Sequence, residues 1–395
     1  MTMPSQHQAR EVIDLCRALI RAKGYSGEEV DAAGVLKNFF VQKGFDEVAV
    51  DEAGNVVGVI NGNRPGPCLL FDGHIDTVPV DEAAWSVDPF GAEERDGRLY
   101  GRGTSDMKGA VAAMAVASAR FAQSTGRNFA GKVVVAGIVQ EELFEGVASR
   151  FVGEAYRPDY VVIGEASNLN LKIGQRGRAE IVVETFGVTA HSAHPETGVN
   201  AIHSMMKAIE AIGCLLVQEH PLLHQGILVL TDIKSEPYPG SSCVPAYCRA
   251  TYDRRTLVGE TRESVLAPIR QYLDRLARED PTFRAKVSYA AGSGRCYTGK
   301  RISAEKFFPA WLYDANEPFV QRCLESLRED GFDPDIAVYD FCTNGSYYAG
   351  EAGIRVIGLG PSREDLAHKV DEYIEISQLS GAVGSYMAVM RALLA

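Results

Sequence analysis

The sequence lacks any apolar run close to the ~20 residues that a membrane-spanning helix requires. Its start, MTMPSQHQAREVIDLCRALIRAKG, also lacks the continuous apolar core and cleavage site of a secretory leader. We therefore expect a soluble protein of the cytoplasm that does not engage a membrane.

Cysteine pairs are missing as well, because none of the eight cysteines forms a CxxC motif. Their scatter fits reduced thiols in a core better than a disulfide framework or a thiolate zinc site. They are Cys16, Cys68, Cys214, Cys243, Cys248, Cys296, Cys323 and Cys342. Any metal in this chain must therefore be held by His, Asp and Glu.

Positive charge is in deficit, with 40 Lys and Arg against 52 Asp and Glu and a formal net charge of −12. A net negative charge opposes the approach of a polyanion or an anionic membrane surface. We expect a small-molecule substrate as the partner and no nucleic acid.

The 395 residues exceed the roughly 250–300 residues at which single hydrophobic cores stop growing, so two domains are expected. Near-continuous β-branched strands are expected at 68–71, 132–139 and 160–163, and a helix at 108–121. Strands of this kind are covered on both faces. They predict an α/β class with a mostly parallel sheet and helices on both of its faces.

Two helices are expected before these strands. Leu15 and Leu19 fall at helical spacing in the first. Ser26 and Glu29 have the spacing of a capping box for the second, which stops near Gly44.

The pattern changes near residue 175 to a strand, a helix, two strands, a helix and a strand. These lie at 178–186, 199–217, 226–233, 246–255, 261–278 and 285–290. The order βαββαβ is that of a ferredoxin-like unit. We therefore predict an inserted α+β lid and dimerisation domain over 175–290, and a catalytic metal-binding domain over 1–174 and 291–395.

Residues that carry chemistry follow the ends of the predicted strands or the turn before a helix. They are His74, Asp76, Asp106, Glu141, Glu142 and Glu165. Ligands of open α/β sheets bind at the carboxyl ends of the strands, so we expect these side chains to converge.

Each of these residues taken alone has an ordinary explanation, such as a capping Asp, a hydrogen-bonded His or a solvated Glu pair. Together, so many carboxylates would repel and raise one another's pKa unless a cation neutralised them. Oxygen and imidazole ligands without thiolate suit zinc, with manganese or cobalt as substitutes.

Six segments in order resemble a known family: GHIDTVP, GRGTSDMKGA, QEE, GEAS, GVTAHSAHPETGVNAI and AHKVDE. They look like the co-catalytic metallopeptidases related to acetylornithine deacetylase, succinyl-diaminopimelate desuccinylase and glutamate carboxypeptidase. Within that family the chain is most similar to a branch of hydrolases linked to selenium metabolism. The resemblance covers nearly the whole chain and implies a hydrolase of peptide or N-acyl amide bonds, of the deacylase, carboxypeptidase or dipeptidase type.

The resemblance also implies the metal ligands. One divalent ion, most often zinc, would be held by His74, Asp106 and Glu165. A second would be held by Asp106, Glu142 and His368, with Asp106 bridging the two ions.

Three further residues take catalytic roles from the resemblance and from chemistry. Glu141 would be the general base. Asp76 would accept the remaining N–H of His74 and so fix its tautomer. His191 matches the family position that reaches the active site of a partner subunit in a homodimer and stabilises the oxyanion.

The substrate residues are less constrained. Arg255 resembles the arginine that grips a free carboxylate, since its planar fork pairs bidentately with one, but Arg254 is an alternative. Asn344 lies in CTNGS, a loop expected to face the substrate, which lacks the aspartate common in the family. Ala110 and Gln140 are minor departures, at positions where a glycine and an acidic residue are frequent.

Two other classes of function remain as alternatives. GRGTSD begins like the GxGxxG of a dinucleotide-binding oxidoreductase, but Asp106 takes the place of the third glycine, and no strand directly precedes Gly101. A non-catalytic binding protein on the same fold would be favoured by loss of Glu141 or of a ligand, and none is missing.

Overall fold

A computed structural model describes residues 6–394, which form two compact units. The first unit comprises the chain up to Gln175, Ser293–Ala304 and the chain from Leu312; the second comprises Arg176–Gly292 and Glu305–Trp311. No helix in residues 6–394 has the length and apolarity to cross a membrane. Residues 1–5, on which the expected absence of a leader partly rests, lie outside the described part.

The first unit is built on a mainly parallel sheet with the strand order β1-β2-β6-β3-β7-β22-β8, and β21 pairs with β8. These strands are β1 (Glu47–Val50), β2 (Val56–Asn61), β3 (Arg64–His74), β6 (Ala130–Ile138), β7 (Tyr160–Ile163), β8 (Leu171–Gln175), β21 (Ile336–Tyr339) and β22 (Arg355–Gly358). The central strands β6, β3, β7 and β22 are parallel to one another, and β1 and β2 extend one edge in antiparallel pairing. The predicted α/β class is confirmed.

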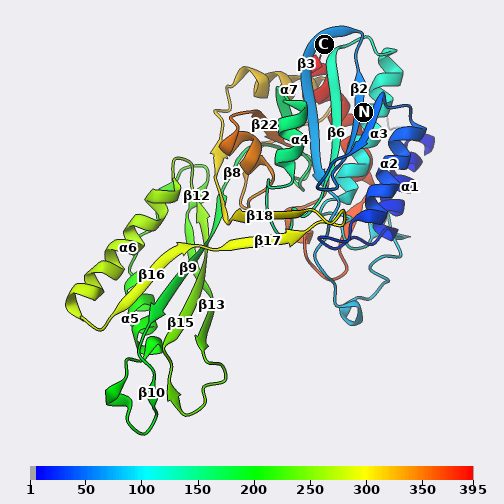
Figure 1. Cartoon of the computed structure of the whole chain (residues 1–395). Coiled ribbons are helices and arrows are strands. Elements are labelled where there is room, and N and C mark those ends of the chain that lie inside the picture. Colours follow the sequence, from blue (N-terminus) through cyan, green and yellow to red (C-terminus); the bar gives the residue numbers. More distant parts are fainter. Residues whose placement is uncertain (1–5, 395) are drawn as a thin grey trace. The chain divides into compact units, whose positions relative to one another are not determined.

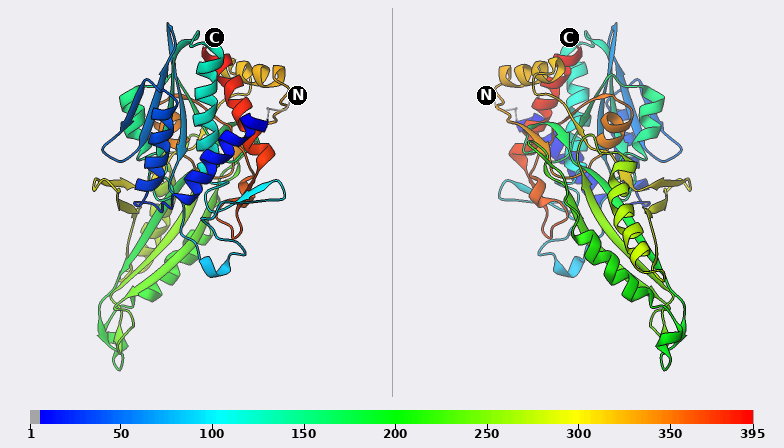
Figure 2. Two further views of the ribbon diagram at one scale, coloured as in Figure 1. Left: turned by 90° about the vertical axis from the view of Figure 1, so that its right-hand side faces the viewer. Right: turned by 90° about the vertical axis from the view of Figure 1, so that its left-hand side faces the viewer.

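Helices cover both faces of this sheet, and Figure 2 shows α4 on the opposite side from α1, α3 and α8. The helices of the unit are α1 (Gln6–Arg21), α2 (Val30–Gln42), α3 (Lys108–Thr125), α4 (Ser149–Tyr156), α7 (Pro318–Glu329) and α8 (Ile376–Leu394). Neighbouring residues of β3 show the two faces. A Cβ at Gly73 would meet Val111 of α3, whereas the Asp72 carboxylate accepts a hydrogen bond from Ser149 of α4. Burial on both sides explains the uninterrupted apolar runs of these strands.

The second unit pairs its strands in the order β13-β15-β9-β16, all antiparallel, with β19 also on β9 (Figure 1). Its elements are β9 (Gly177–Phe186), α5 (Ala201–Gly213), β13 (Ile227–Glu236), β15 (Tyr247–Thr256), α6 (Arg262–Glu279), β16 (Arg284–Tyr289) and β19 (Phe307–Phe308). Alternate residues of β9, including Ala179, Ile181 and Val183, pack with Met205 of α5 and Ile269 of α6 in one core. This is the strand order of the predicted ferredoxin-like unit.

Short strands complete both units. They are β4 (Glu93–Arg95), β5 (Arg98–Tyr100) and β23 (Tyr373–Glu375) in one small sheet, and the pairs β10 (Ala190–His191) with β14 (Cys243–Val244), β11 (Glu219–His220) with β12 (His224–Gln225), and β17 (Ala291–Arg295) with β18 (Arg301–Glu305). The chain passes from one unit to the other between β8 and β9, within β17, within β18 and within β20 (Trp311–Leu312).

The predicted capping box before α2 is wrong. Glu29 is the N-cap residue, but no side chain caps the helix there. The hydroxyl of Ser26 instead donates to the Asp76 carboxylate at 2.7 Å. The Glu29 carboxylate accepts the backbone N–H groups of Gly27 and Gln140 at 2.8 and 3.2 Å. Both side chains therefore bind other segments of the unit in place of the helix end.

Candidate metal centre

The predicted ligands of the first unit follow the carboxyl ends of its parallel strands. His74 is the last residue of β3, Glu141 and Glu142 follow β6, and Glu165 follows β7. His368 lies in the segment after β22, and its backbone has a φ of 61°, in the left-handed region. Because these strands are neighbours in the sheet, their ends bring the side chains to one edge.

Asp106, from the turn before α3, lies between the two histidines. Its Oδ1 is 2.9 Å from Nε2 of His74, and its Oδ2 is 3.1 Å from Nε2 of His368. One carboxylate thus presents one oxygen to each imidazole, which is the arrangement of a bridging ligand.

Glu165 and Glu142 complete two groups around Asp106. Glu165 Oε1 lies 3.5 Å from Nε2 of His74, and Glu142 Oε2 lies 3.0 Å from Nε2 of His368. Candidate ligand atoms of His74, Asp106 and Glu142 all lie within 4.8 Å of one another, as do those of His74, Glu141 and Glu165. The structure therefore brings together all five residues expected to hold metal, with Glu141 beside them.

Burial makes the charges of this cluster depend strongly on one another. Burial and the charge of Asp106 raise the pKa of Glu165 to about 8, and burial with the neighbouring glutamates raises that of Glu141 well above its usual value. Hydrogen bonds to Asp106 and Glu142 raise the pKa of His368 to about 10. Although burial opposes it, the two imidazoles keep the pKa of Asp106 below its usual value. The neighbouring carboxylates therefore stabilise the protonated form of His368, and the two imidazoles stabilise the charged form of Asp106.

The donor set fits divalent cations. Glu142 Oε1 is buried and has no hydrogen-bond partner among residues 6–394, so this oxygen is available to a ligand that is not part of the protein. Carboxylate and imidazole donors bind zinc, manganese or cobalt, and positive charge would relieve the repulsion that raises the pKa values.

Comparison with known sequences agrees with this geometry. Residues 70–392 match the sequence profile of peptidase family M20/M25/M40. The chain belongs to that family. The resemblance read from the motifs is therefore confirmed.

Curated relatives of this M20 chain match over nearly its full length. "Uncharacterized protein YgeY" of Escherichia coli K12 is 32% identical over 382 residues, covering 94% of this chain and 92% of that protein. "Succinyl-diaminopimelate desuccinylase 2" of Ruegeria sp. TM1040 is 28% identical over 408 residues, covering 99% and 97% of the two chains.

Solved structures share the fold at lower identity. The aminopeptidase PepT of Bacillus cereus superposes with a TM-score of 0.76 at 18% identity and 98% coverage of both chains. The YXEP protein of Bacillus subtilis, described as a dinuclear metal-binding M20 peptidase, gives a TM-score of 0.72 at 14% identity, with 98% and 99% coverage.

Asp76 has a wider role than the sequence indicated. The hydrogen bond from Nδ1 of His74 goes to the backbone carbonyl of Asp76 at 2.9 Å, and the Asp76 carboxylate lies 3.5 Å away. That carboxylate accepts the backbone N–H groups of Glu141 and Glu142 at 3.1 and 3.2 Å. Asp76 therefore orients His74 through its backbone and holds the glutamate pair through its side chain.

Asn344 differs from its prediction as a substrate contact. Its side chain is 3% exposed, with Nδ2 donating to Asp72 at 2.9 Å and Oδ1 accepting from the N–H of Gly146 at 2.7 Å. Both polar atoms are used inside the protein, so Asn344 fastens the segment after the glutamate pair to β3. Asp72 was not selected in the sequence analysis. Its signal in the sequence is that it is a charged residue directly after the apolar residues of LLFDGH.

The two arginines that the sequence offers for binding a substrate carboxylate have different surroundings in the second unit. Arg254 is 5% exposed and forms an ion pair with Glu260 at 2.6 Å. Arg255 is more exposed and pairs through Nε with Asp253 at 3.0 Å. Arg254 is thus committed to the fold, and Arg255 is the better candidate for binding a carboxylate.

His191 is an exposed residue of the short strand β10 in the second unit. Its Nδ1 accepts the backbone N–H of Ala193 at 3.0 Å, so the proton of the neutral ring is on Nε2. An imidazole held in this way can offer an Nε2–H to an oxyanion.

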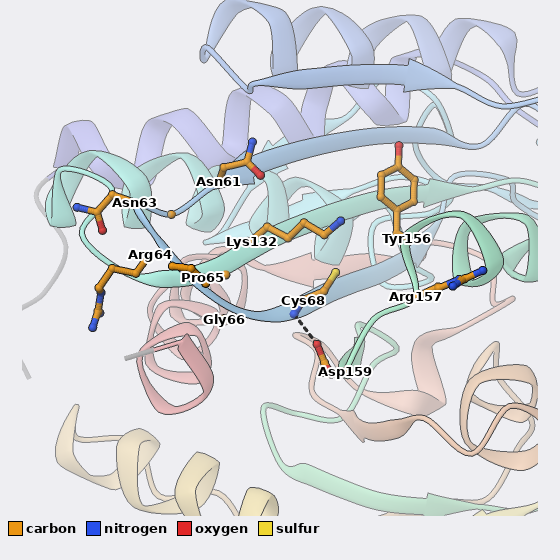
Figure 3. A pocket seen from close by; sticks show the side chains of 12 residues that line it. Asn61, Asn63, Arg64, Pro65, Gly66, Cys68, Lys132, Tyr156, Arg157 and Asp159 are labelled. Atoms are coloured by element: carbon orange, nitrogen blue, oxygen red, sulfur yellow. Dashed lines mark hydrogen bonds between the residues drawn. The ribbon is translucent and has the colours of Figure 1, made fainter.

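A separate pocket of about 620 Å³ lies at the amino ends of β3 and β6 (Figure 3). Lys132 lies in its middle, whereas Arg64 and Arg157 point away from one another and do not converge on an anion. Because β3 runs from Arg64 to His74, this pocket and the ligand cluster lie at opposite ends of one strand. It takes no part in the candidate metal centre.

Proposed function

We propose that this M20 chain is a di-metal hydrolase that cleaves a peptide or N-acyl amide bond next to a free carboxylate. The observation that carries the proposal is the position of Asp106 between the imidazoles of His74 and His368. His74, Asp106 and Glu165 would hold one ion, and Asp106, Glu142 and His368 the other, with zinc the best-suited metal. The family match supports metal-dependent amide hydrolysis.

The chain's own residues supply the acid–base chemistry. Metal ions bound there would polarise the scissile carbonyl and lower the pKa of the attacking water. Glu141 accepts a proton from that water at its carboxylate and passes it to the leaving amine nitrogen. The raised pKa of Glu141, due to burial and the adjacent glutamates, favours holding this proton between the two steps. Asp76 fixes the backbone of Glu141 while this happens.

The alternatives have less support. The expectation that no strand directly precedes Gly101 is wrong, because β5 ends at Tyr100, although β5 belongs to the small antiparallel sheet with β4 and β23. The dinucleotide alternative is still disfavoured, because in GRGTSD the carboxylate of Asp106 is bound by two imidazoles and would repel a pyrophosphate. A non-catalytic binding protein would need neither a base nor so many buried acids, and both are present.

A panel of N-acyl amino acids and dipeptides tests the proposed function. We expect the zinc-loaded protein to release free amine from substrates with a free carboxylate and to hydrolyse their carboxamide analogues far more slowly. Arg255→Gln should raise KM for the carboxylate substrates by about 10- to 100-fold, as a charged hydrogen bond is worth roughly 1.5–3 kcal/mol. Absence of hydrolysis across the panel would contradict the proposal. Arg254→Gln is the matched control, expected to lower thermal stability instead.

We also propose a homodimer that pairs through the second unit. β13 is an edge strand whose apolar side chains are exposed, with Ile227, Val229 and Ile233 each at least 40% accessible. An open apolar edge is a pairing surface, and a two-fold axis would place the same strand of each chain against the other. His191 of one subunit would then serve the active site of its partner.

His191→Ala is expected to lower turnover by about 10²- to 10³-fold with little change in KM, since an oxyanion donor acts mainly in the transition state. Mixing inactive His191→Ala chains with inactive Glu141→Ala chains should restore some activity after subunit exchange. Each heterodimer would contain one site with both residues intact. Confirmed exchange without any recovery would show that His191 does not act across the dimer.

The cytoplasm is the proposed location. All eight cysteines, which lie within residues 6–394, are free thiols, as expected in a reducing compartment.

A further inference from the structure

Gln140 stands directly before the proposed base and is almost fully buried, at 1% exposure. Its φ of 61° lies in the left-handed region, which residues with a Cβ rarely adopt. Its carbonyl accepts the N–H of Phe144 at 3.1 Å and so starts the turn that carries Glu141 and Glu142. Strained backbone of this kind persists only where its surroundings hold it.

The contacts that hold Gln140 come from two distant segments of the first unit. Its backbone N–H donates to the Glu29 carboxylate at 3.2 Å, and its side-chain Nε2 donates to the backbone carbonyl of Arg295 at 2.9 Å. Arg295 ends β17, whose first residues, Ala291 and Gly292, belong to the second unit. Gln140 thus joins the base-bearing turn to a strand that enters the second unit.

Two glycines make this contact possible. A Cβ at Gly294 would lie 2.6 Å from Oε1 of Gln140, and a Cβ at Gly27 would lie 3.1 Å from its Nε2 and 2.8 Å from the carbonyl oxygen of Arg295. Cβ atoms in proteins essentially never approach other atoms as closely as 2.6 or 2.8 Å, and a separation of 3.1 Å is tighter than most of their contacts. Any other residue at either position would displace the Gln140 amide or β17.

We propose that Gln140 is a positioning residue that couples Glu141 to β17. The proposal rests on the role of Glu141 as the base. A neutral amide can donate to the Arg295 carbonyl, whereas an ionised carboxylate at this position could only accept. Displacement of β17 at Arg295 would therefore pull on the residue next to the base and shift the Glu141 carboxylate relative to the substrate.

Gln140→Met tests the coupling, because methionine keeps the length of the side chain and removes the donor. We expect kcat for an N-acyl amino acid to fall by about 10- to 100-fold, since a displacement near 1 Å can cost about 10²-fold. KM and the content of bound metal should stay near wild type. Gly294→Ala, which presses on the same amide, should give the same selective loss and should not add fully to Gln140→Met in the double variant.

Thr298→Val is the matched control. Thr298 lies in the turn between β17 and β18. The substitution removes the hydrogen bond from its hydroxyl to the carbonyl of Glu52 at 2.7 Å and leaves the contact between Gln140 and Arg295 in place. Its kcat should be near wild type. The proposal is overturned if Gln140→Met and Gly294→Ala, folded and metal-loaded, keep normal kcat, or if Thr298→Val loses as much. Normal turnover in Glu141→Gln would instead overturn the base assignment itself.

Discussion

Removal of divalent cations with a chelator is expected to abolish amide hydrolysis and to lower the melting temperature. The buried carboxylates around Asp106 then lose the charge that neutralises them, and the folded state loses the stabilisation that a bound ligand provides by mass action. Addition of zinc, manganese or cobalt should restore both properties. Metal content, initial rate and thermal unfolding, measured on the same samples, check this prediction.

The control for this experiment is the chelator saturated with zinc before use, which should leave rate and stability unchanged. Binding is expected to reach two ions per chain. Full activity in protein verified to be free of metal would contradict both the cofactor and the mechanism.

Glu141→Gln is expected to lower turnover by about 10²- to 10⁴-fold, the range that general acid–base groups supply, while two metals remain bound. The amide keeps the shape of the side chain but cannot take up a proton. The rate should therefore fall while the metal content stays unchanged. Both can be measured on one preparation, by initial rates and by elemental analysis.

Glu142→Gln is the matched comparison, one residue away in the same turn. It alters an oxygen next to His368 and should reduce occupancy of one metal position, leaving the group around His74 and Glu165 filled. Near-normal turnover in Glu141→Gln would assign the base to another residue, and loss of metal from that variant would make Glu141 a metal ligand.

The sequence predicted those parts of the molecule that depend on periodicity and on strand ends. The buried run YVVI predicted β7 with its observed bounds, because a strand covered on both faces is a near-continuous apolar run in the sequence. The order of elements after Gln175 gave the ferredoxin-like unit. Convergence of His74, Glu142 and Glu165 followed from the rule for parallel sheets, whereas His368 came only from the resemblance.

The polar partners of buried side chains were not predictable in the same way. Ser26 and Glu29 have the local spacing of a capping box, yet they bind Asp76 and Gln140, which are distant in sequence. Asn344 was assigned to substrate because its loop resembles one that faces it, but a buried Asp72 takes up its amide. A short polar side chain has several hydrogen-bond donors or acceptors within reach, and only the folded chain decides which is nearest.

The split of the first unit across the sequence has a consequence for synthesis on the ribosome. β7 is made early, but its neighbour β22 lies on the far side of the inserted unit in the sequence. At about 5–20 residues per second, some ~10–40 s separate Ile163 from Arg355, and during that time β7 has an unpaired edge. Open edges recruit other strands, so the nascent chain is most prone to aggregate in this interval. Holdase chaperones should therefore act between the emergence of the two strands.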